Sequence, residues 1–533
     1  INEWPLRPSY GGSEFRKTTN NIHIMTMIII LASFLSVSLL VMILVRVLKK
    51  LWWIPFHVQS VMKSQGIQGP PYKFLHGNTK EIVEMRKDSG RKAMDHLSHD
   101  IFPKVLPHIF SWKKLYGANF LYWNGLQPEL VVTEPELLKE ILSNRNNDYP
   151  KMDLEGFTKK LLGDGVASSK GEKWTKMRKL ANHVFHGESL KNMIPAMIMS
   201  CETMLDRWKI YEDKEIEVFE EFRLLTSEII SRTAFGSSYL EGENIFQMLM
   251  KLALLVSRNA NTFRFPGISR IWKSCDEIES EKLEQGIRDS ITRMIKKREQ
   301  EKTGGEEHNF GSDLLGKLLE EYQDDRISVE DIVDECKTIY FAGHETTTLL
   351  LGWTIFLLAT NKKWQEKARK EVLESFGQKV PTADGLSRLK IINMILDESL
   401  RLYPPVPFVK RKVDNKVQLG KPTLPPQTLL YISPLAVQHD PKIWGEDVHI
   451  FKPDRFAEGV IKATNNNPIA FLPFGYGPRT CLGLNFAMIE AKVTLSMILQ
   501  SYTFTISPTY VHSPAQLFML RPQHGVKVIL HKI

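Results

Sequence analysis

The chain has 533 residues, of which 43% are hydrophobic and 25% are charged. This balance is typical of a globular protein and excludes a mainly disordered, collagen-like or multi-span membrane chain. The formal net charge of +9 suits an anionic lipid surface or an acidic protein partner, and none of the short nucleic-acid-binding motifs is present. The four scattered cysteines are too few for a disulfide scaffold or a zinc ribbon, and they favour a reducing compartment: Cys201, Cys275, Cys336 and Cys481.

An uncharged segment of 22 residues, Ile24–Val45, predicts one transmembrane helix near the N-terminus. At about 1.5 Å per residue it spans roughly the 30 Å of a hydrocarbon core. Basic residues follow it, with Trp52 and Trp53 placed as interfacial anchors. A secretory signal peptide has a shorter apolar region, and a buried helix of a soluble protein rarely stays uncharged for so long. Because the chain begins at Ile1 rather than Met, we expect the native N-terminus to lie upstream.

These features divide the sequence into four predicted parts. Residues 1–23 form an N-terminal tail, 24–45 the transmembrane anchor, 46–71 a basic linker that ends in a proline hinge, and 72–533 one large folded body. The hinge has the sequence GIQGPP, whose glycines and prolines predict a stiff turn between anchor and body.

The body is predicted to be mainly α-helical with a minor β region, an α+β protein. Amphipathic stretches indicate helices at Gly171–Asn192, Cys201–Ala234 and Ile327–Thr360. Short runs rich in proline and β-branched residues indicate strands near 130–133 and between 404 and 433.

Two pairs of side chains stand at helical spacing. Trp174 and Arg178 are four residues apart, and Glu398 and Arg401 are three apart, so each pair lies on one helix face. Taken alone, both pairs are typical of an amphipathic surface helix and indicate no function.

A long predicted helix begins near Ser328, where the sequence SVED has the pattern of a capping box. It contains the segment AGHETT, residues 342–347. Gly343 costs about 1 kcal/mol in mid-helix and a nearby Thr can divert backbone hydrogen bonds, so we expect a kink or groove here. Alternatively, Thr346 simply bonds back to a carbonyl one turn earlier. A zinc-peptidase motif is excluded, because Thr348 stands where that motif requires a second His.

The most informative motif is FGYGPRTCLG, residues 474–483. A thiolate that binds iron needs a tight loop with backbone donors near the sulfur and shelter from water. Gly475, Gly477 and Gly483 offer permissive backbone, and the helical stretch from Leu482 onward would direct its N-terminal dipole toward Cys481. The spacing of Phe, Gly, Arg, Cys and Gly arises by accident in roughly one of 10⁴ chains of this length.

This loop resembles the cysteine loop of the cytochrome P450 superfamily of haem-thiolate monooxygenases, and the upstream motifs follow in the order and spacing of that family. The resemblance covers roughly residues 50–533, so the body 72–533 is expected to be a haem-thiolate catalytic domain with the cytochrome P450 fold. Segments 66–70, 341–347 and 477–487 are similar to those of plant microsomal members, the group often called clan seventy-two. Leu484 and Asp454 depart from the residues common in that group, Gln and Glu, but neither change affects a group that the mechanism needs.

The resemblance implies a haem b cofactor whose axial thiolate is Cys481. It further implies a set of residues that hold the haem, several of them through its propionates: Trp174, Arg178, Arg411, Phe474, Arg479 and Gly483.

The resemblance also assigns catalytic and structural roles. Thr346 and Glu345 are implied to be the alcohol and the acid that manage protons during oxygen activation. Glu398 and Arg401, completed by Arg455 of the segment PDRF, are implied to form a buried structural network.

The implied reaction inserts one atom of O2 into a C–H bond of a lipophilic small molecule with electrons from NADPH. Segment 475–480 breaks the dinucleotide-binding fingerprint at its third glycine, so the electrons are expected from a separate NADPH–cytochrome P450 reductase. The expected location is the endoplasmic reticulum membrane, with a single-pass N-terminal anchor in the membrane lipid and the catalytic domain facing the cytosol.

By family position, four segments should line the substrate pocket: 152–170, 340–347, 406–409 and 515–517. Apolar residues such as Phe341, Val406 and Phe408 favour terpenoids, steroid-like hormones or fatty acyl compounds. Two other functions stay open, a haem-thiolate peroxide isomerase or dehydratase and a non-catalytic membrane haem-binding protein. Thr346 favours oxygenation, because peroxide-rearranging relatives often lack it.

Overall fold

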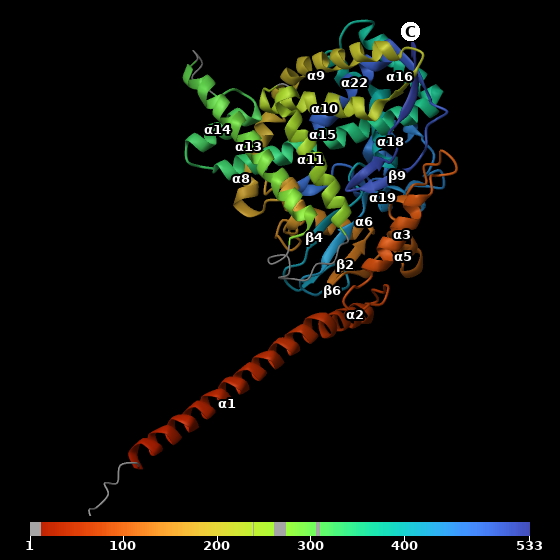
Figure 1. Ribbon diagram of the computed structural model, residues 1–533. Coiled ribbons are helices and arrows are strands. Elements are labelled where there is room, and N and C mark those ends of the chain that lie inside the picture. Colours follow the sequence, from red (N-terminus) through yellow and green to blue (C-terminus); the bar gives the residue numbers. More distant parts are fainter. Residues whose placement is uncertain (1–11, 238, 261–272, 305–309) are drawn as a thin grey trace, which may run out of the picture.

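The computed structural model describes residues 12–237, 239–260, 273–304 and 310–533. Helix α1 (Gly12–Leu48) extends away from a large helical body and continues through a π-helical turn (Lys49–Trp53) into α2 (Ile54–Ser64), which lies against the body (Figure 1). In the described part of the chain this is the one helix long and apolar enough to cross a membrane, with a mean hydropathy of 3.0 and none of its apolar window buried. The helix starts at Gly12, so it also includes part of the predicted tail.

The body is mainly helical. Its α-helices are α3 (Thr79–Arg91), α4 (Phe102–Val105), α5 (Pro107–Tyr116), α6 (Pro135–Ser143), α7 (Gly156–Leu162), α8 (Gly171–Val184), α9 (Gly187–Trp208), α10 (Val218–Phe235), α11 (Tyr239–Asn259), α13 (Cys275–Gly304), α14 (Leu314–Gln323), α15 (Val329–Thr360), α16 (Lys362–Phe376), α17 (Ala383–Arg388), α18 (Lys390–Leu402), α19 (Pro434–Gln438), α20 (Pro441–Trp444), α21 (Val460–Ala463) and α22 (Leu484–Ser501).

The minor β region consists of four small sheets. They are β1 (Phe120–Asn124), β2 (Gln127–Val132), β7 (Leu429–Ile432) and β4 (Val409–Lys412) in that order, β3 (Glu215–Glu217), β11 (Lys527–Lys532) and β8 (Tyr502–Ile506), β9 (Pro514–Leu517) with β10 (Met519–Pro522), and β5 (Val417–Gln418) with β6 (Thr423–Leu424). β2 and β7 pair in parallel, whereas the other pairs are antiparallel. The predicted strands near 130–133 and within 404–433 are therefore confirmed, as is the α+β class.

Helix α15 runs through the centre of the body, where α10 and α22 pack against it (Figure 1). The predicted capping box is present: the Ser328 hydroxyl accepts from the Asp331 N–H, and the Asp331 carboxylate accepts from the Ser328 N–H. α15 is helical from Val329 to Thr360, and a Cβ added to Gly343 would lie 2.8 Å from the Ile230 side chain of α10. The close packing of α10 against α15 therefore favours a glycine at this position, within the segment where a kink or groove is expected from the sequence.

Two of the predicted amphipathic helices are interrupted. The stretch 171–192 divides into α8 and α9, with Gly187 at a positive φ of 55° where α9 begins. The stretch 201–234 divides because residues 215–217 form β3, which pairs with the distant β11. Helical periodicity does not register such long-range strand pairing, so the prediction of continuous helices was wrong at these two places.

Candidate functional site

Cys481 lies on a loop between two short turns, directly before α22. Gly475 and Gly477 both have a φ of 72°, and a Cβ on Gly477 would meet the Leu142 carbonyl oxygen at 2.3 Å, so glycine is required there. The Cys481 N–H donates to the Phe474 carbonyl at 2.8 Å, which closes the loop. Gly483 has a φ of −87°, a value that any residue can adopt. The expectation that this position needs the conformational freedom of glycine is therefore wrong. Gly483 serves instead as the N-cap of α22.

The Cys481 side chain is exposed where α22 begins. Burial of the loop raises the pKa of the thiol, whereas a hydrogen bond from the Gly483 N–H and the charges of Arg178 and Lys151 act in the opposite direction. The N-terminus of an α-helix adds a partial positive charge that favours an anion. The sulfur thus has donors and positive charge on its own side, as a thiolate ligand of iron needs.

Four cations gather beside this loop. Arg178 donates to the Thr480 carbonyl at 2.7 Å, and Arg479 donates to the Ser169 carbonyl at 2.9 Å. The Arg479 guanidinium also stacks 4.0 Å over the Trp174 ring. Arg411 of β4 is largely buried, and Arg411, Arg479 and Lys151 line one cavity of about 1370 Å³ together with Trp174.

None of these four cations forms an ion pair with a carboxylate in the described part of the chain. Burial lowers the pKa of Arg411 and that of Arg479 to about 10, and burial together with the charges of Arg411 and Arg479 lowers the pKa of Lys151 to about 7. Like charges gathered without a counter-ion are costly, so the cluster is complete only with an anionic ligand. A haem with two propionates fits these donors beside a cysteine.

Lys151 was not identified from the sequence. It lies outside every motif, directly before the segment 152–170 that was assigned to the pocket. Only the fold brings it beside Arg411 and Arg479, and no spacing in the sequence could have indicated this.

The middle of α15 presents an opening in an otherwise buried helix. Ala342 is exposed although most neighbouring residues of the helix are buried. The Thr346 hydroxyl donates back to the Ala342 carbonyl at 2.7 Å, as the simpler alternative for this residue anticipated. The Glu345 side chain is 1% exposed, and its Oε1 lies 2.6 Å from Nε of Arg521 on β10. Arg521, a second residue that the sequence did not indicate, thus joins the C-terminal hairpin to α15.

The predicted pocket segments take different positions. The ring of Phe341 is 2% exposed and lies 5.7 Å from that of Phe518, so it packs between α15 and the β9–β10 hairpin. Val406 and Phe408 are half-buried, and the Phe408 ring stacks on Tyr431 at 5.1 Å. Apolar surface is therefore available at 406–408 and at Ala342, whereas Phe341 belongs to the core.

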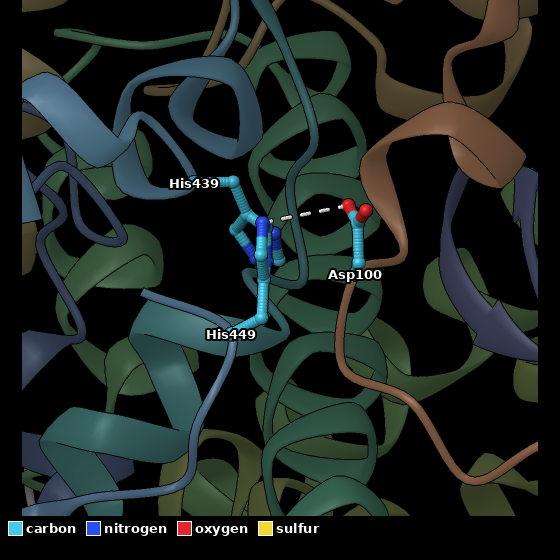
Figure 2. Close-up of side chains that lie close together, drawn as sticks. All are labelled: Asp100, His439 and His449. Carbon is cyan, nitrogen blue, oxygen red and sulfur yellow. Dashed lines mark ion pairs between the residues drawn. The ribbon is translucent and has the colours of Figure 1, made fainter. Parts of the chain in front are cut away.

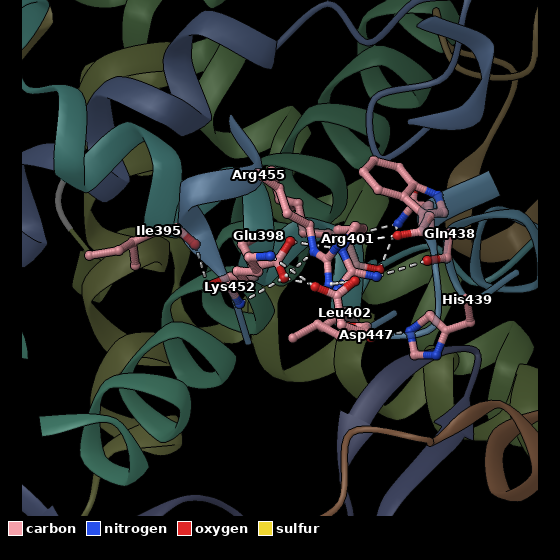
Figure 3. Close-up of polar contacts among 12 residues, drawn as sticks. Ile395, Glu398, Arg401, Leu402, Gln438, His439, Asp447, Lys452 and Arg455 are labelled. Atoms are coloured by element: carbon pink, nitrogen blue, oxygen red, sulfur yellow. Dashed lines mark hydrogen bonds and ion pairs between the residues drawn. The ribbon is translucent and has the colours of Figure 1, made fainter. Parts of the chain in front are cut away.

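Glu398 and Arg401 of α18 form a buried network with Arg455 (Figure 3). Both side chains of the first pair are 0% exposed, and Arg401 binds Glu398 in a fork with distances of 2.7 and 2.9 Å. Arg455 Nε lies 3.4 Å from Glu398 and its guanidinium also binds Asp447 at 2.7 Å, while Arg401 donates to the Gln438 carbonyl at 3.0 Å. The structure thus brings these three charges together, and each has a partner.

Residues 103–529 match the family described as Cytochrome P450. Among curated relatives, cytochrome P450 CYP749A22 of Panax ginseng is 55% identical over 96% of this chain and 99% of its own length. Cytochrome P450 734A1 of Arabidopsis thaliana is 42% identical over 93% and 96%. The 11-oxo-beta-amyrin 30-oxidase of Medicago truncatula is 38% identical over 95% and 98%.

These similarities confirm the predicted family, its plant type and its mainly helical fold. They also make the protein an oxidoreductase, a monooxygenase with a haem and an axial cysteine thiolate. With a matched region that includes the cysteine loop, the cation cluster and α15, the chain belongs to the cytochrome P450 family.

Proposed function

We propose that the protein is a membrane-anchored monooxygenase that hydroxylates a lipophilic small molecule with O2 and electrons delivered from NADPH by a reductase. The observation that carries this proposal is the position of Cys481 at the start of α22, beside four cations that lack a carboxylate partner in the described residues. The haem, when bound, supplies the activation of O2.

Cys481 would hold the iron of the haem, and the surrounding residues would hold the rest of the cofactor. Arg178, Arg411 and Arg479 have the planar forks that match carboxylates such as propionates, with Trp174 stacked behind Arg479. Phe474 and Gly483 stand at the two ends of the loop, where the first accepts from the Cys481 N–H and the second caps α22. These contacts would hold the cofactor beside the cysteine loop.

Thr346 and Glu345 act on protons. The Thr346 hydroxyl gives its own proton to the Ala342 carbonyl, which leaves its oxygen lone pairs as acceptors for a donor in the cavity. The Glu345 carboxylate is held by the Arg521 guanidinium at 2.6 Å. Thr346 is therefore the group that positions the proton, and Glu345 the group that resupplies it.

The substrate class follows from apolar surface and from the relatives. Ala342 together with Val406 and Phe408 offers apolar contacts, which favour a lipophilic compound. A relative named as an 11-oxo-beta-amyrin oxidase makes terpenoids the first class to test, before steroid-like hormones and fatty acyl compounds.

A partner reductase and a place in the endoplasmic reticulum membrane complete the proposal. A cavity of about 680 Å³ beside the cysteine loop is lined by Lys191 and Lys492 as well as by Phe474, so basic groups lie near this loop. An acidic flavoprotein surface suits this face and the net charge of +9. The exposed apolar residues of α1 support an N-terminal membrane anchor. The proposal places the catalytic domain on the cytosolic side.

The ligand assignment is tested by the carbon-monoxide difference spectrum of the reduced protein. We expect Cys481→Ser to lose the thiolate-type band, whereas Cys275→Ser, at an exposed cysteine elsewhere, keeps it. An unchanged spectrum in Cys481→Ser would refute the assignment.

The oxygenase is distinguished from a peroxide isomerase by its need for a reductase. We expect product from terpenoid candidates only with NADPH and reductase, and conversion of a peroxide without them would favour the isomerase. In Thr346→Ala we expect more hydrogen peroxide and less product per NADPH. Thr360→Ala is the matched control, because Thr360 makes the same bond to a carbonyl one turn earlier near the end of α15.

A further inference from the structure

Three side chains from separate segments converge at one point of the body. Asp100 precedes α4, His439 follows α19, and His449 lies in the segment after α20, and all three point toward a common centre (Figure 2). One possible ligand atom from each lies within 4.8 Å of the other two. This place belongs to neither the cysteine loop nor the cation cluster.

His439 has a free ring nitrogen in a buried position. The residue is 3% exposed, and its Nε2 lies 2.9 Å from the Leu402 carbonyl oxygen. Because a carbonyl only accepts, Nε2 carries the proton and Nδ1 carries the lone pair. That Nδ1 is buried and has no hydrogen-bond partner among the described residues. Histidines that bind metals commonly donate their other ring N–H to a backbone carbonyl in this way.

The side chains of His449 and Asp100 lie on the solvent-accessible side of the place where the three residues converge. The Nε2 of His449 lies 3.7 Å from Oδ1 of Asp100, too far for a hydrogen bond. The Nδ1 of His449 is buried and also lacks a partner in the described part of the chain. The two side chains are 33% and 44% exposed, so an ion has a path from solvent. The imidazole rings of His439 and His449 stand 5.4 Å apart.

Burial and the charge of Arg401 act in the same direction on both imidazoles. Burial and then the charge of Arg401 lower the pKa of His439 well below 6.5. Burial also lowers the pKa of His449, with Asp100 acting against it and Arg401 reinforcing it. The nearby His99 is occupied by the Tyr403 hydroxyl at 2.9 Å. Neutral imidazole is the form that binds a metal ion.

We propose that Asp100, His439 and His449 bind a divalent transition-metal ion such as Zn²⁺, with water in the fourth position. Two imidazoles and one carboxylate are a common donor set for zinc. Donor atoms that lie about 2.0–2.2 Å from a tetrahedral zinc ion lie roughly 3.4 Å from one another. The partly exposed side chains of Asp100 and His449 must therefore move inward when the ion binds.

The role of this ion would be structural. His439 follows Gln438, whose carbonyl accepts from Arg401, and His449 lies between Asp447 and Lys452, which contact Arg455 and Glu398. The ion would therefore join the segment before α4 to the two segments that complete the buried network. It is separate from the haem iron and takes no part in oxygen chemistry.

Zinc binding to the purified haem-loaded protein, first treated with a chelator, tests the proposal. Calorimetry with Zn²⁺ alone should find one high-affinity equivalent in the unmodified chain, with affinity at least tenfold lower in Asp100→Asn and His449→Gln. His531→Gln is the matched control, because His531 lies 3.3 Å from Asp213 in an exposed pair without a third ligand. Zinc should also raise the thermal unfolding midpoint of the unmodified chain and of the control, but not of the two site variants.

The reduced carbon-monoxide spectrum of each variant shows whether its body is folded, independently of zinc. Equal zinc affinity in the unmodified chain and in both folded site variants would overturn the proposal, as would the absence of a high-affinity equivalent in the unmodified chain. A variant that does not fold is replaced by Asp100→Ala or His449→Ala at the same positions, and the same comparison decides.

Discussion

Two groups of buried charges in this protein differ in how they are balanced. In the network of Glu398, Arg401 and Arg455, a carboxylate meets two guanidiniums, and neither Glu398 nor Arg401 is exposed at all. In the cluster that contains Arg411 and Arg479, no cation pairs with a carboxylate of the described residues. The first group is satisfied within the chain, whereas the second is not.

The difference indicates what each group is for. A buried charge without a partner destabilises a fold, and a paired one costs little. A satisfied network can therefore serve the fold alone, while an unbalanced cluster is retained because an anion completes it. Motif spacing does not distinguish a structural site from a ligand site, whereas the balance of charge does.

The largest effect is expected where one partner of the satisfied network is removed. Arg401→Leu removes the two short bonds to the buried Glu398 carboxylate and leaves it only the longer contact with Arg455 and one backbone N–H, which should cost about 3–5 kcal/mol of unfolding free energy. Urea unfolding of the haem-loaded protein measures this, and little folded protein should be recovered. Lys370→Leu, which breaks the exposed pair with Glu374 at 3.8 Å, should cost less than about 0.5 kcal/mol. Equal midpoints for the two variants would contradict the structural role of Arg401.

Substitutions in the unbalanced cluster should have the opposite effect, because the haem should be lost while the fold is retained. Arg479→Gln or Arg411→Gln removes a charged donor worth about 1.5–3 kcal/mol, so the haem should bind roughly 10–100-fold more weakly. The transfer of haem to an acceptor protein measures this. Arg326→Gln is the control, since Arg326 pairs with Glu321 on the surface at 2.8 Å. Unchanged haem retention in both cluster variants would mean that these arginines do not bind propionates.

The stability of the haem-free protein should depend more strongly on pH than that of the haem-loaded protein. The pKa of Lys151 is lowered to about 7 by burial and by the two arginines, against about 10.4 when unfolded. Between these values the unfolded chain binds more protons, so the haem-free protein should gain stability as the pH rises from 7 toward 10. Haem propionates would raise the Lys151 pKa again and flatten this slope.

Urea unfolding between pH 7 and 9.5 tests this expectation. Lys151→Met should remove the slope from the haem-free protein, and Lys179→Met, an exposed lysine that lines the same cavity, should not. A slope that survives in Lys151→Met would show that another group titrates there.

The candidate site could be found from the sequence only where its residues belong to local motifs. The cysteine loop and the α15 segment 342–347 each lie within a few residues, so spacing identified them before the fold was known. Lys151 and Arg521 reach the site through long-range contacts, with Arg521 pairing to Glu345 across 176 positions. Single side chains brought in by the fold leave no pattern in a sequence, and this is why both were missed.

The prediction of the fold from the sequence has the same limit. The apolar run of α1 and the long helix α15 follow from local hydrophobicity and capping. The division of 201–234 by β3 depends on pairing with residues 527–529 at the other end of the chain. The close contact of Gly343 with Ile230 of α10 is likewise a long-range feature that the sequence of the helix alone does not indicate.

The smallest effect is expected at the rim of the satisfied network, where Asp447 is 34% exposed and binds Arg455 at 2.7 Å and Lys452 at 3.0 Å. Burial raises the pKa of this carboxyl, but hydrogen bonds from Lys452 and Arg455 outweigh it and lower the pKa overall. Its contribution is therefore present above the unfolded pKa of about 3.9 and is lost as the pH falls below it. Asp447→Asn should cost no more than about 1 kcal/mol at pH 7, because solvent screens the pair. Urea unfolding should show a larger difference at pH 7 than at pH 3, because the contribution is lost progressively as the pH falls through the lowered folded pKa. A loss at pH 7 as large as that in Arg401→Leu would mean that the network is buried as far as its rim.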